Sequence, residues 1–174
     1  MRLYLVGYMG CGKSSIGRKV ARRLGVEFVD TDAKVEQAEQ ASVVDIVNYA
    51  GEEYFRRCER KALDDTASCT DAVISTGGGL PVWHDNMERI HALGRSVYLR
   101  RTPEQILSRL SPYGRQKRPK FRGLDDEQLL AFMRQNMAER EPVYAQADLV
   151  IDGAMLSDAD IIERIAAWLA QTEN

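Results

Sequence analysis

The chain has 174 residues, of which 44% are hydrophobic and 29% charged, and its formal net charge is −2. This length and composition predict one soluble domain with a sizeable core, and they exclude a general attraction of the whole molecule to nucleic acid. The cysteines, Cys11, Cys58 and Cys69, show no metal-ligand spacing, so we expect reduced thiols in a cytoplasmic protein. The apolar run at the N-terminus is short, so we expect no signal peptide and no membrane span.

A phosphate-binding loop (P-loop) is predicted near the start of the chain. Residues 7–14, GYMGCGKS, match the pattern G-x-x-x-x-G-K-S; an expected strand at 3–6 precedes them and an expected helix at 13–24 follows. The glycines let backbone N–H groups face a phosphate chain, and the helix N-terminus adds a partial positive charge. Lys13 would reach the β- and γ-phosphates, and the Ser14 hydroxyl would hold Mg²⁺. The motif predicts nucleoside triphosphate binding and leaves the phosphate acceptor open.

Two aspartates, Asp30 and Asp32, follow the second expected strand at 27–29. Residues i and i+2 of an extended backbone point to the same side, so both carboxylates are expected to face the phosphate site. One would hold Mg²⁺ or its waters, and the other would accept a hydroxyl proton from a phosphate acceptor. The alternative is a pair of helix-capping aspartates.

Arginine side chains stand on two of the expected helices. Arg56 lies three residues before Glu59, which could hold it in place, and Arg140 ends a helix near Pro142. Arginine binds a carboxylate or phosphate in a planar, bidentate manner, although a single helical arginine is more often solvated. The expected helices of this part of the chain cover residues 32–38, 42–50 and 52–68.

Three consecutive glycines, Gly77 to Gly79, follow the third expected strand at 72–75. They present bare backbone, permit positive φ and allow a small ligand to approach closely, although a flexible turn is the alternative. Ser75 occupies the place where a metal-binding aspartate would often follow such a strand. We therefore expect the metal to rely on Ser14 and Asp30.

Residues 111–124 show neither helical nor strand periodicity and contain two prolines and two glycines, which predicts a mobile loop. Five basic residues fall between positions 115 and 122, so this loop could form a local site for a polyanion. A solvated connection without function is the alternative. The remaining expected strands are 96–99 and 148–151, and the remaining expected helices are 85–93, 103–110, 125–140 and 157–170.

Five short strands separated by longer helices predict βαβ units and a parallel sheet. We expect a single α/β domain over residues 1–174, a three-layer αβα P-loop domain with a five-stranded parallel sheet. In such domains ligands gather at the carboxyl ends of the strands, where the candidate side chains lie.

The whole set of motifs resembles the shikimate kinase family. Beyond the P-loop, the matching pieces are Asp30-Thr31-Asp32, Gly51-Glu52-x-x-Phe55-Arg56-x-x-Glu59, Ser75-Thr76-Gly77-Gly78-Gly79, Arg118-Pro119 and Arg140-x-Pro142-x-Tyr144. The P-loop occurs in many families, whereas this combination is much more specific and covers essentially the whole chain.

The resemblance implies ATP-dependent phosphorylation of the 3-hydroxyl of shikimate, giving shikimate 3-phosphate and ADP, in the pathway to chorismate and the aromatic amino acids. It also implies a nucleoside-monophosphate-kinase-like fold, with a mobile lid at 111–124 and a shikimate-binding helical segment at 32–60. The implied partners are shikimate and ATP with Mg²⁺ as cofactor, and we expect a cytoplasmic monomer that binds neither nucleic acid nor membrane.

The family resemblance also assigns roles to individual residues. Asp32 would be the base and Arg118 would close onto the phosphates. The implied catalytic set is Lys13, Asp32 and Arg118; the ATP-binding set is Gly10, Cys11, Gly12, Lys13, Ser14, Ser15, Arg109 and Arg118; the shikimate-binding set is Asp32, Arg56, Gly78, Gly79 and Arg140; and the metal ligands are Ser14 and Asp30.

One departure from the family pattern lies in the lid, where two leucines usually follow Arg-Pro but this chain has Lys120 and Phe121. Three other functions stay open from the sequence alone. A gluconate or nucleotide kinase would use a similar scaffold, a nucleic-acid-dependent ATPase would use the basic loop, and a regulator would bind ATP without catalysis.

Overall fold

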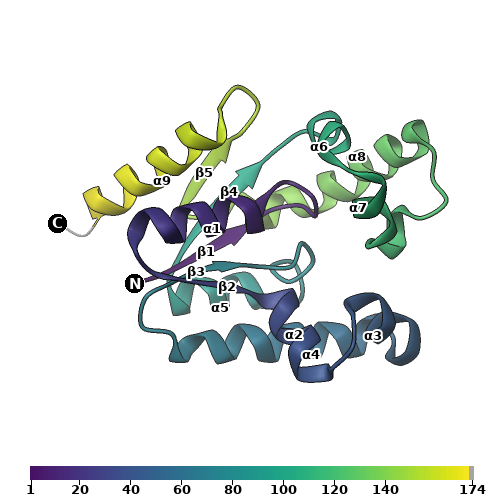
Figure 1. The fold of residues 1–174 in the computed structure, drawn as a ribbon, viewed down its shortest axis with the longest axis horizontal. Coiled ribbons are helices and arrows are strands. Elements are labelled where there is room, and N and C mark those ends of the chain that lie inside the picture. The colour runs from purple at the N-terminus through teal and green to yellow at the C-terminus, as the bar shows by residue number, and fades with distance from the viewer. Residues whose placement is uncertain (173–174) are drawn as a thin grey trace.

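The computed structural model describes residues 1–172 and contains a five-stranded parallel sheet in the order β2-β3-β1-β4-β5 (Figure 1). This arrangement confirms the predicted parallel α/β architecture. The strands are β1 (Arg2–Val6), β2 (Glu27–Asp30), β3 (Ala72–Ser75), β4 (Arg95–Arg100) and β5 (Leu149–Asp152).

Strand β1 lies at the centre of the sheet because both of its edges are paired. Leu3 pairs with Val73 of β3 on one side and with Arg95 of β4 on the other. The apolar run Leu3–Val6 is fully buried, as expected for a parallel strand that helices cover on both faces.

Helices cover both faces of the sheet, which completes the three layers. Figure 1 shows α1 and α9 together on one face and α4 and α5 on the other. Lys19 and Arg23 of α1 form ion pairs with Asp158 and Glu163 of α9. The helices are α1 (Lys13–Leu24), α2 (Thr31–Glu39), α3 (Val43–Ala50), α4 (Glu52–Asp65), α5 (Asn86–Leu93), α6 (Pro103–Arg109), α7 (Pro112–Gln116), α8 (Asp126–Tyr144) and α9 (Asp158–Thr172), with short 3₁₀ helices η1 (Thr66–Ser68) and η2 (Pro119–Phe121).

Helices α2 and α3 pack against α4, the helix that also covers one face of the sheet, and share a small core with it. Val35, Ile46, Phe55 and Ala62 pack together there, apart from the main core. The segment predicted at 32–60 therefore folds as a helical unit that rests on its own apolar contacts.

The prediction of a loop at 111–124 is wrong in one respect, because this region contains α7 and η2. Ser111 caps α7 by accepting a hydrogen bond from the Gly114 backbone, and a proline occupies the first helical position. Phe121 at the end of η2 is buried. Its ring packs edge-on against the Phe132 ring, with 6.3 Å between the two ring centres. The periodicity is invisible in the sequence because each of these helices is about one turn long.

Helix α8 also differs from its prediction, because it continues past Arg140 and through Pro142 to Tyr144. Proline removes a single backbone donor, and here it falls close to the end of the helix, where one lost bond disturbs few turns. The continuation places Arg140 and Tyr144 four residues apart on the same helical face.

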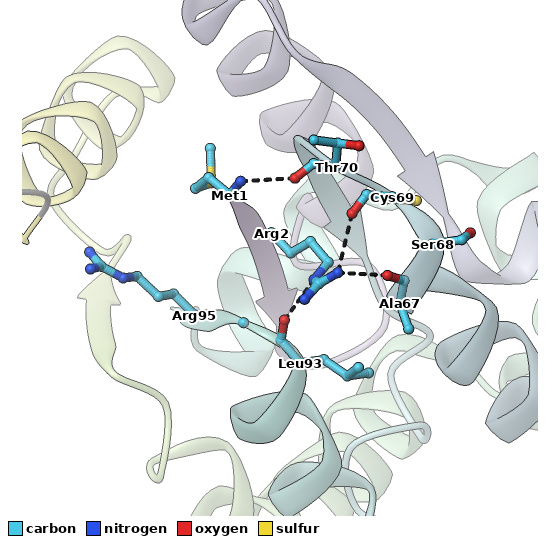
Figure 2. Close-up of a pocket in the computed structure, with 9 residues that line it drawn as sticks. Met1, Arg2, Ala67, Ser68, Cys69, Thr70, Leu93 and Arg95 are labelled. Carbon is cyan, nitrogen blue, oxygen red and sulfur yellow. Dashed lines mark hydrogen bonds between the residues drawn. The ribbon is translucent and has the colours of Figure 1, made fainter.

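A hollow of about 550 Å³ opens at the amino ends of β1 and β4, opposite the edge where the motif residues gather. Figure 2 shows Arg2 in this hollow, with its guanidinium donating to the carbonyls of Leu93 (2.7 Å), Ala67 (2.7 Å) and Cys69 (3.2 Å). The Arg2 guanidinium already forms hydrogen bonds to these backbone groups and ties the segments together. The hollow is therefore a structural contact rather than a candidate site.

Gly17 sets how closely α1 approaches the sheet. A methyl group built on Gly17 would lie 2.6 Å from the Phe28 ring and 3.1 Å from the Leu5 side chain. We therefore predict that Gly17→Ala lowers the free energy of unfolding by about 1–3 kcal/mol, because overpacking outweighs the better helix propensity of alanine.

Urea denaturation would measure this change. Arg22→Ala on the exposed side of the same helix is the control, with an expected change within about 0.5 kcal/mol. A Gly17→Ala protein that is as stable as the parent would contradict the proposed close contact.

Candidate active site

The P-loop connects β1 to α1 and depends on three glycines in left-handed or otherwise positive-φ conformations. Gly7, Gly10 and Gly12 have φ values of 143°, 82° and 100°. Gly12 is also the N-cap of α1 and has no side chain to bond the first-turn N–H groups. The start of α1 therefore presents backbone donors and a positive dipole end, which suit a phosphate group.

Lys13 is buried against the P-loop. Its ammonium donates to the carbonyls of Gly7 (2.8 Å) and Tyr8 (3.0 Å). These bonds hold the positive charge at the loop, where the sequence predicted that it would meet phosphates.

Three side-chain oxygen atoms, from Ser14, Asp30 and Ser75, lie close together next to the P-loop. The Ser14 hydroxyl lies 2.7 Å from Asp30 Oδ2 and 3.2 Å from the Ser75 hydroxyl. The other oxygen of Asp30 caps α2 by accepting from the backbone N–H groups of Asp32 and Ala33. Asp30 therefore takes the helix-capping role that was the alternative and also lies against the P-loop serine.

This oxygen cluster fits a small hard cation. Hydroxyl and carboxylate oxygens are the ligands that Mg²⁺ prefers, and Mg²⁺ uses few carboxylates because it keeps several waters. Among residues 1–172, no group of three or more His, Cys, Asp or Glu residues could hold a metal ion, so an all-protein metal cage is absent from this part of the chain.

Asp32 reaches the site by a different route from the one predicted. It lies in the first turn of α2 rather than on an extended strand, so the strand-alternation argument was wrong. Its Oδ1 atom is buried and has no hydrogen-bond partner among residues 1–172. Burial, followed by the charge of Asp30, raises the pKa of Asp32 to about 6. Such a carboxyl group is suited to exchange a proton near neutral pH.

The glycines at 77–79 act through close approach, because none of them has a positive φ; the conformational role we predicted was wrong. A methyl group on Gly77 would lie 2.6 Å from Asp32 Oδ1, and one on Gly78 would lie 2.9 Å from the Met9 backbone nitrogen. A methyl group on Gly79 would overlap the Arg56 guanidinium. Each glycine thus meets a different part of the site.

Arg56 of α4 is held by two carboxylates, Glu59, which the helical spacing predicted, and Glu52, which it did not. Its Nη1 atom lies 2.5 Å from Glu59 Oε2, and its Nη2 atom lies 3.0 Å from Glu52 Oε1. Glu59 is buried, and this burial raises the pKa of its carboxyl to about 7 although Arg56 opposes the rise. The Arg56 side chain is 14% exposed, so a small part of its surface is open to a ligand.

Arg140 of α8 approaches the same region from the opposite side. It donates to the Gly78 carbonyl at 3.2 Å and lies over the Tyr8 ring, 5.5 Å from the ring centre. The Tyr144 hydroxyl donates to the same carbonyl. Tyr144 belongs to the motif Arg140-x-Pro142-x-Tyr144 that the sequence analysis singled out, but no contact was predicted for it or for Tyr8.

Arg118 and Arg109 border the P-loop. A methyl group on Gly10 would lie 3.9 Å from Arg118 Nη2, and one on Gly12 would lie 3.7 Å from Arg109 Nη2. Burial lowers the pKa of Arg118, which donates to the Gly114 carbonyl within the lid. Arg109 also pairs loosely with Asp158 at 3.7 Å.

Arg101 is a P-loop contact that the sequence reasoning missed. It is buried and donates through Nε to the Cys11 carbonyl at 3.0 Å and through Nη1 to the Gly153 carbonyl at 3.2 Å. Its position directly after β4, at the carboxyl edge of the sheet, was the signal that could have found it. Of the predicted nucleotide-binding residues, Cys11 is buried in the loop and Ser15 is exposed in the first turn of α1.

The site thus combines a glycine-rich loop at a helix N-terminus with two arginines and a carboxyl group whose Oδ1 atom has no hydrogen-bond partner among residues 1–172. Residues 9–170 match the family model for shikimate kinase. The chain belongs to the shikimate kinase family. A shikimate kinase from Parabacteroides distasonis is 38% identical over 161 residues, which cover 92% of each chain.

Solved structures of the family have the same fold. The shikimate kinase of Bacteroides thetaiotaomicron is 34% identical, covers 98% of each chain and superposes with a TM-score of 0.89. That of Acinetobacter baumannii, solved in complex with shikimate, is 31% identical, covers 98% of this chain and 93% of its own, and has a TM-score of 0.88. The protein is therefore a kinase that uses ATP to phosphorylate shikimate in aromatic biosynthesis.

Gly78 and Gly79 offer a way to disturb the two halves of the site separately. We predict that Gly78→Ala raises the KM for ATP more than that for shikimate, because the new methyl group would push against the P-loop at Met9. Gly79→Ala should do the reverse, because its methyl group would displace Arg56. A misplacement on the scale of 1 Å can change rates by roughly tenfold to a hundredfold.

Steady-state kinetics with each substrate varied would measure the two KM values, and each variant serves as the control for the other. If both variants changed the two KM values in equal proportion, the assignment of one glycine to each half of the site would be wrong.

Proposed function

We propose that the enzyme transfers the γ-phosphate of ATP to the 3-hydroxyl of shikimate, giving shikimate 3-phosphate and ADP, with Asp32 as the base. The observation that carries this proposal is the Oδ1 atom of Asp32, which is buried and has no hydrogen-bond partner among residues 1–172. This atom lies beside Gly77, and the next two glycines contact the P-loop and Arg56. A buried acceptor without a donor suits an incoming hydroxyl group, which can supply the missing hydrogen bond.

The two arginines bind the carboxylate of shikimate in this proposal. Arg56 and Arg140 approach neighbouring glycines, Gly79 and Gly78, so an acid placed there can meet two guanidinium groups at once. The Gly78 and Gly79 backbone supports the ring. Glu59 positions Arg56 and limits how far its guanidinium can move.

Phosphoryl transfer needs alignment and charge neutralisation more than covalent chemistry. Lys13 and the P-loop backbone at Gly10, Cys11 and Gly12 bind the phosphates together with Ser14 and Ser15, and Arg109 completes the nucleotide site. Arg118 stabilises the transferring group, for which an arginine can contribute roughly 10³–10⁵ in rate.

Ser14 and Asp30 would hold Mg²⁺, and the Ser75 hydroxyl lies next to them. Bound there, the cation would neutralise part of the charge on the β- and γ-phosphates. Asp30 also fixes the start of α2, so the same residue sets the position of Asp32.

Residues 111–124 act as a mobile lid on a single domain of residues 1–174, and closure would keep water from competing with shikimate for the phosphate. We also propose a cytoplasmic monomer that does not bind nucleic acid, on the basis of the cysteine content and the acidic net charge. Within residues 1–172 no helix is both long and apolar enough to cross a membrane.

Substrate choice can be tested directly by ADP release with a panel of acceptors. We expect fast release with shikimate and at most slow release with gluconate or nucleoside monophosphates, because the paired arginines and Asp32 suit a carboxylate joined to a ring alcohol. A matched reaction without acceptor gives the background ATPase rate. Comparable turnover of gluconate or a nucleoside monophosphate would contradict the proposed substrate.

The role of Asp32 can be tested by its pH dependence. The base must be ionised, so the kcat/KM of the wild type should fall about tenfold per pH unit below its pKa of about 6 and level off above it. Asp32→Asn should lower kcat by roughly 10²–10⁴ and remove this acid limb, with the dissociation constant for ATP unchanged.

Asp65→Asn makes the same chemical change on an exposed residue at the end of α4 and should leave the pH profile intact. An Asp32→Asn enzyme with near-normal kcat, or with the same acid limb, would remove Asp32 as the base.

A further inference from the structure

One carboxylate oxygen links the lid to the shikimate-binding helices. Glu52 is the first residue of α4, and its Oε1 atom accepts hydrogen bonds from Arg56 Nη2 and from Lys120 Nζ, each at 3.0 Å. Lys120 belongs to η2 in the lid, far from Glu52 in the sequence. The guanidinium beside Gly79 and an ammonium of the lid therefore share the same oxygen atom.

The three groups differ in their exposure to solvent. Arg56 is 14% exposed and is also held by the buried Glu59, whereas Glu52 and Lys120 are 49% and 44% exposed. Partial burial works to raise the pKa of Glu52, but the two cations outweigh it and the pKa lies below the usual value. Glu52 therefore stays ionised at neutral pH, and both cations stay attracted to it.

The neighbours of Lys120 fix which way this part of the lid faces. Phe121 is buried against Phe132, and its backbone N–H bonds to the Arg118 carbonyl at 2.9 Å. Arg118 lies beside Gly10 of the P-loop. One short, anchored turn therefore carries an arginine toward the phosphate site and a lysine toward the acceptor helix, so the positions of the two side chains are connected.

We propose that Lys120 is a positioning residue that couples the binding of the acceptor acid to the placement of Arg118 at the phosphates, acting through Glu52. The inference rests on the proposed function of Arg56 as a carboxylate ligand. An acid bound to Arg56 takes up part of that guanidinium, which leaves Glu52 Oε1 to Lys120. The Glu52–Lys120 ion pair then becomes stronger, and it holds the lid turn, and with it Arg118, over the nucleotide.

The size of this coupling is limited, because the Glu52–Lys120 pair is half exposed. Ion pairs of this kind shift an equilibrium by about two- to fivefold and weaken as salt screens the charges. Coupling between two binding sites is reciprocal, so the acceptor should tighten nucleotide binding by the same factor by which the nucleotide tightens acceptor binding. That factor is the quantity to measure.

Calorimetric titration of ADP into the enzyme, with and without saturating shikimate, gives this coupling factor as a ratio of two dissociation constants. In the wild type the ratio should exceed one. Lys120→Met should lower it by about two- to fivefold and leave ADP binding without shikimate unchanged. Lys120→Arg should keep the ratio, and raising the salt concentration should reduce it in the wild type but not in Lys120→Met.

Lys117→Met is the matched control, because it removes the same charge from the lid at a lysine whose ammonium lies over the Tyr113 ring, 4.7 Å from its centre. It should keep the ratio of the wild type. An equal loss of the ratio in Lys117→Met, an unchanged ratio in Lys120→Met, or a wild-type ratio of one would each overturn the inference.

These outcomes are distinct from a failure of the proposed function. A wild type that phosphorylates shikimate while Lys120→Met keeps the full ratio overturns only the coupling role of Lys120. A wild type that neither binds nor phosphorylates shikimate overturns the proposed function, and the coupling inference with it. Steady-state kinetics of the same variants supports the inference if the KM for shikimate at low ATP rises in Lys120→Met alone.

Discussion

The active site depends on how closely the backbone at Gly77, Gly78 and Gly79 approaches its neighbours. Space for a single methyl group is missing at each of these positions, because a carboxyl group, the P-loop backbone and a guanidinium occupy it in turn. Protein interiors are packed tightly enough that such a contact transmits displacement rather than absorbing it. The P-loop, Asp32 and Arg56 therefore keep fixed relative positions through one short piece of chain.

The buried charges of the site balance one another at close range. Asp32 and Glu59 lose solvation on burial, which by itself favours their neutral forms, while Lys13, Arg56 and Arg140 favour the charged forms. The result is carboxyl groups whose pKa values lie close to neutrality. Groups that are oriented before the substrate arrives need little rearrangement during the reaction, and this preorganisation is a main source of electrostatic catalysis.

The strand and helix order could be predicted from the sequence because apolar runs and helical periods are long enough to recognise. The start of α1 at Lys13 and the parallel sheet are confirmed. Short elements could not be found in this way: α7 and η2 each cover about one turn, which leaves no period to detect. Pro142 also misled the prediction, since a proline near a helix end costs less than one in the middle.

Among the candidate site residues, Asp32 lies next to the P-loop edge as expected, but for a different physical reason. Asp32 faces the site because Asp30 caps a helix and starts a turn there, not because a strand alternates. The lid departure at Lys120 and Phe121 divides into two roles: Phe121 supplies the apolar packing, and Lys120 bonds to Glu52. Such roles depend on partners distant in the sequence, which no local pattern reveals.

The Gly78 carbonyl accepts hydrogen bonds from both Arg140 and Tyr144, so both of its lone pairs are in use. A trans peptide unit is planar, and its N–H points opposite to its C=O. Anchoring this oxygen to α8 therefore aims the amide of Gly79 away from α8. A flip of the peptide plane, which glycine-rich chain otherwise undergoes at little cost, would break two hydrogen bonds at once. Helix α8 thereby fixes the orientation of the peptide between Gly78 and Gly79, although glycine has more backbone freedom than any other residue.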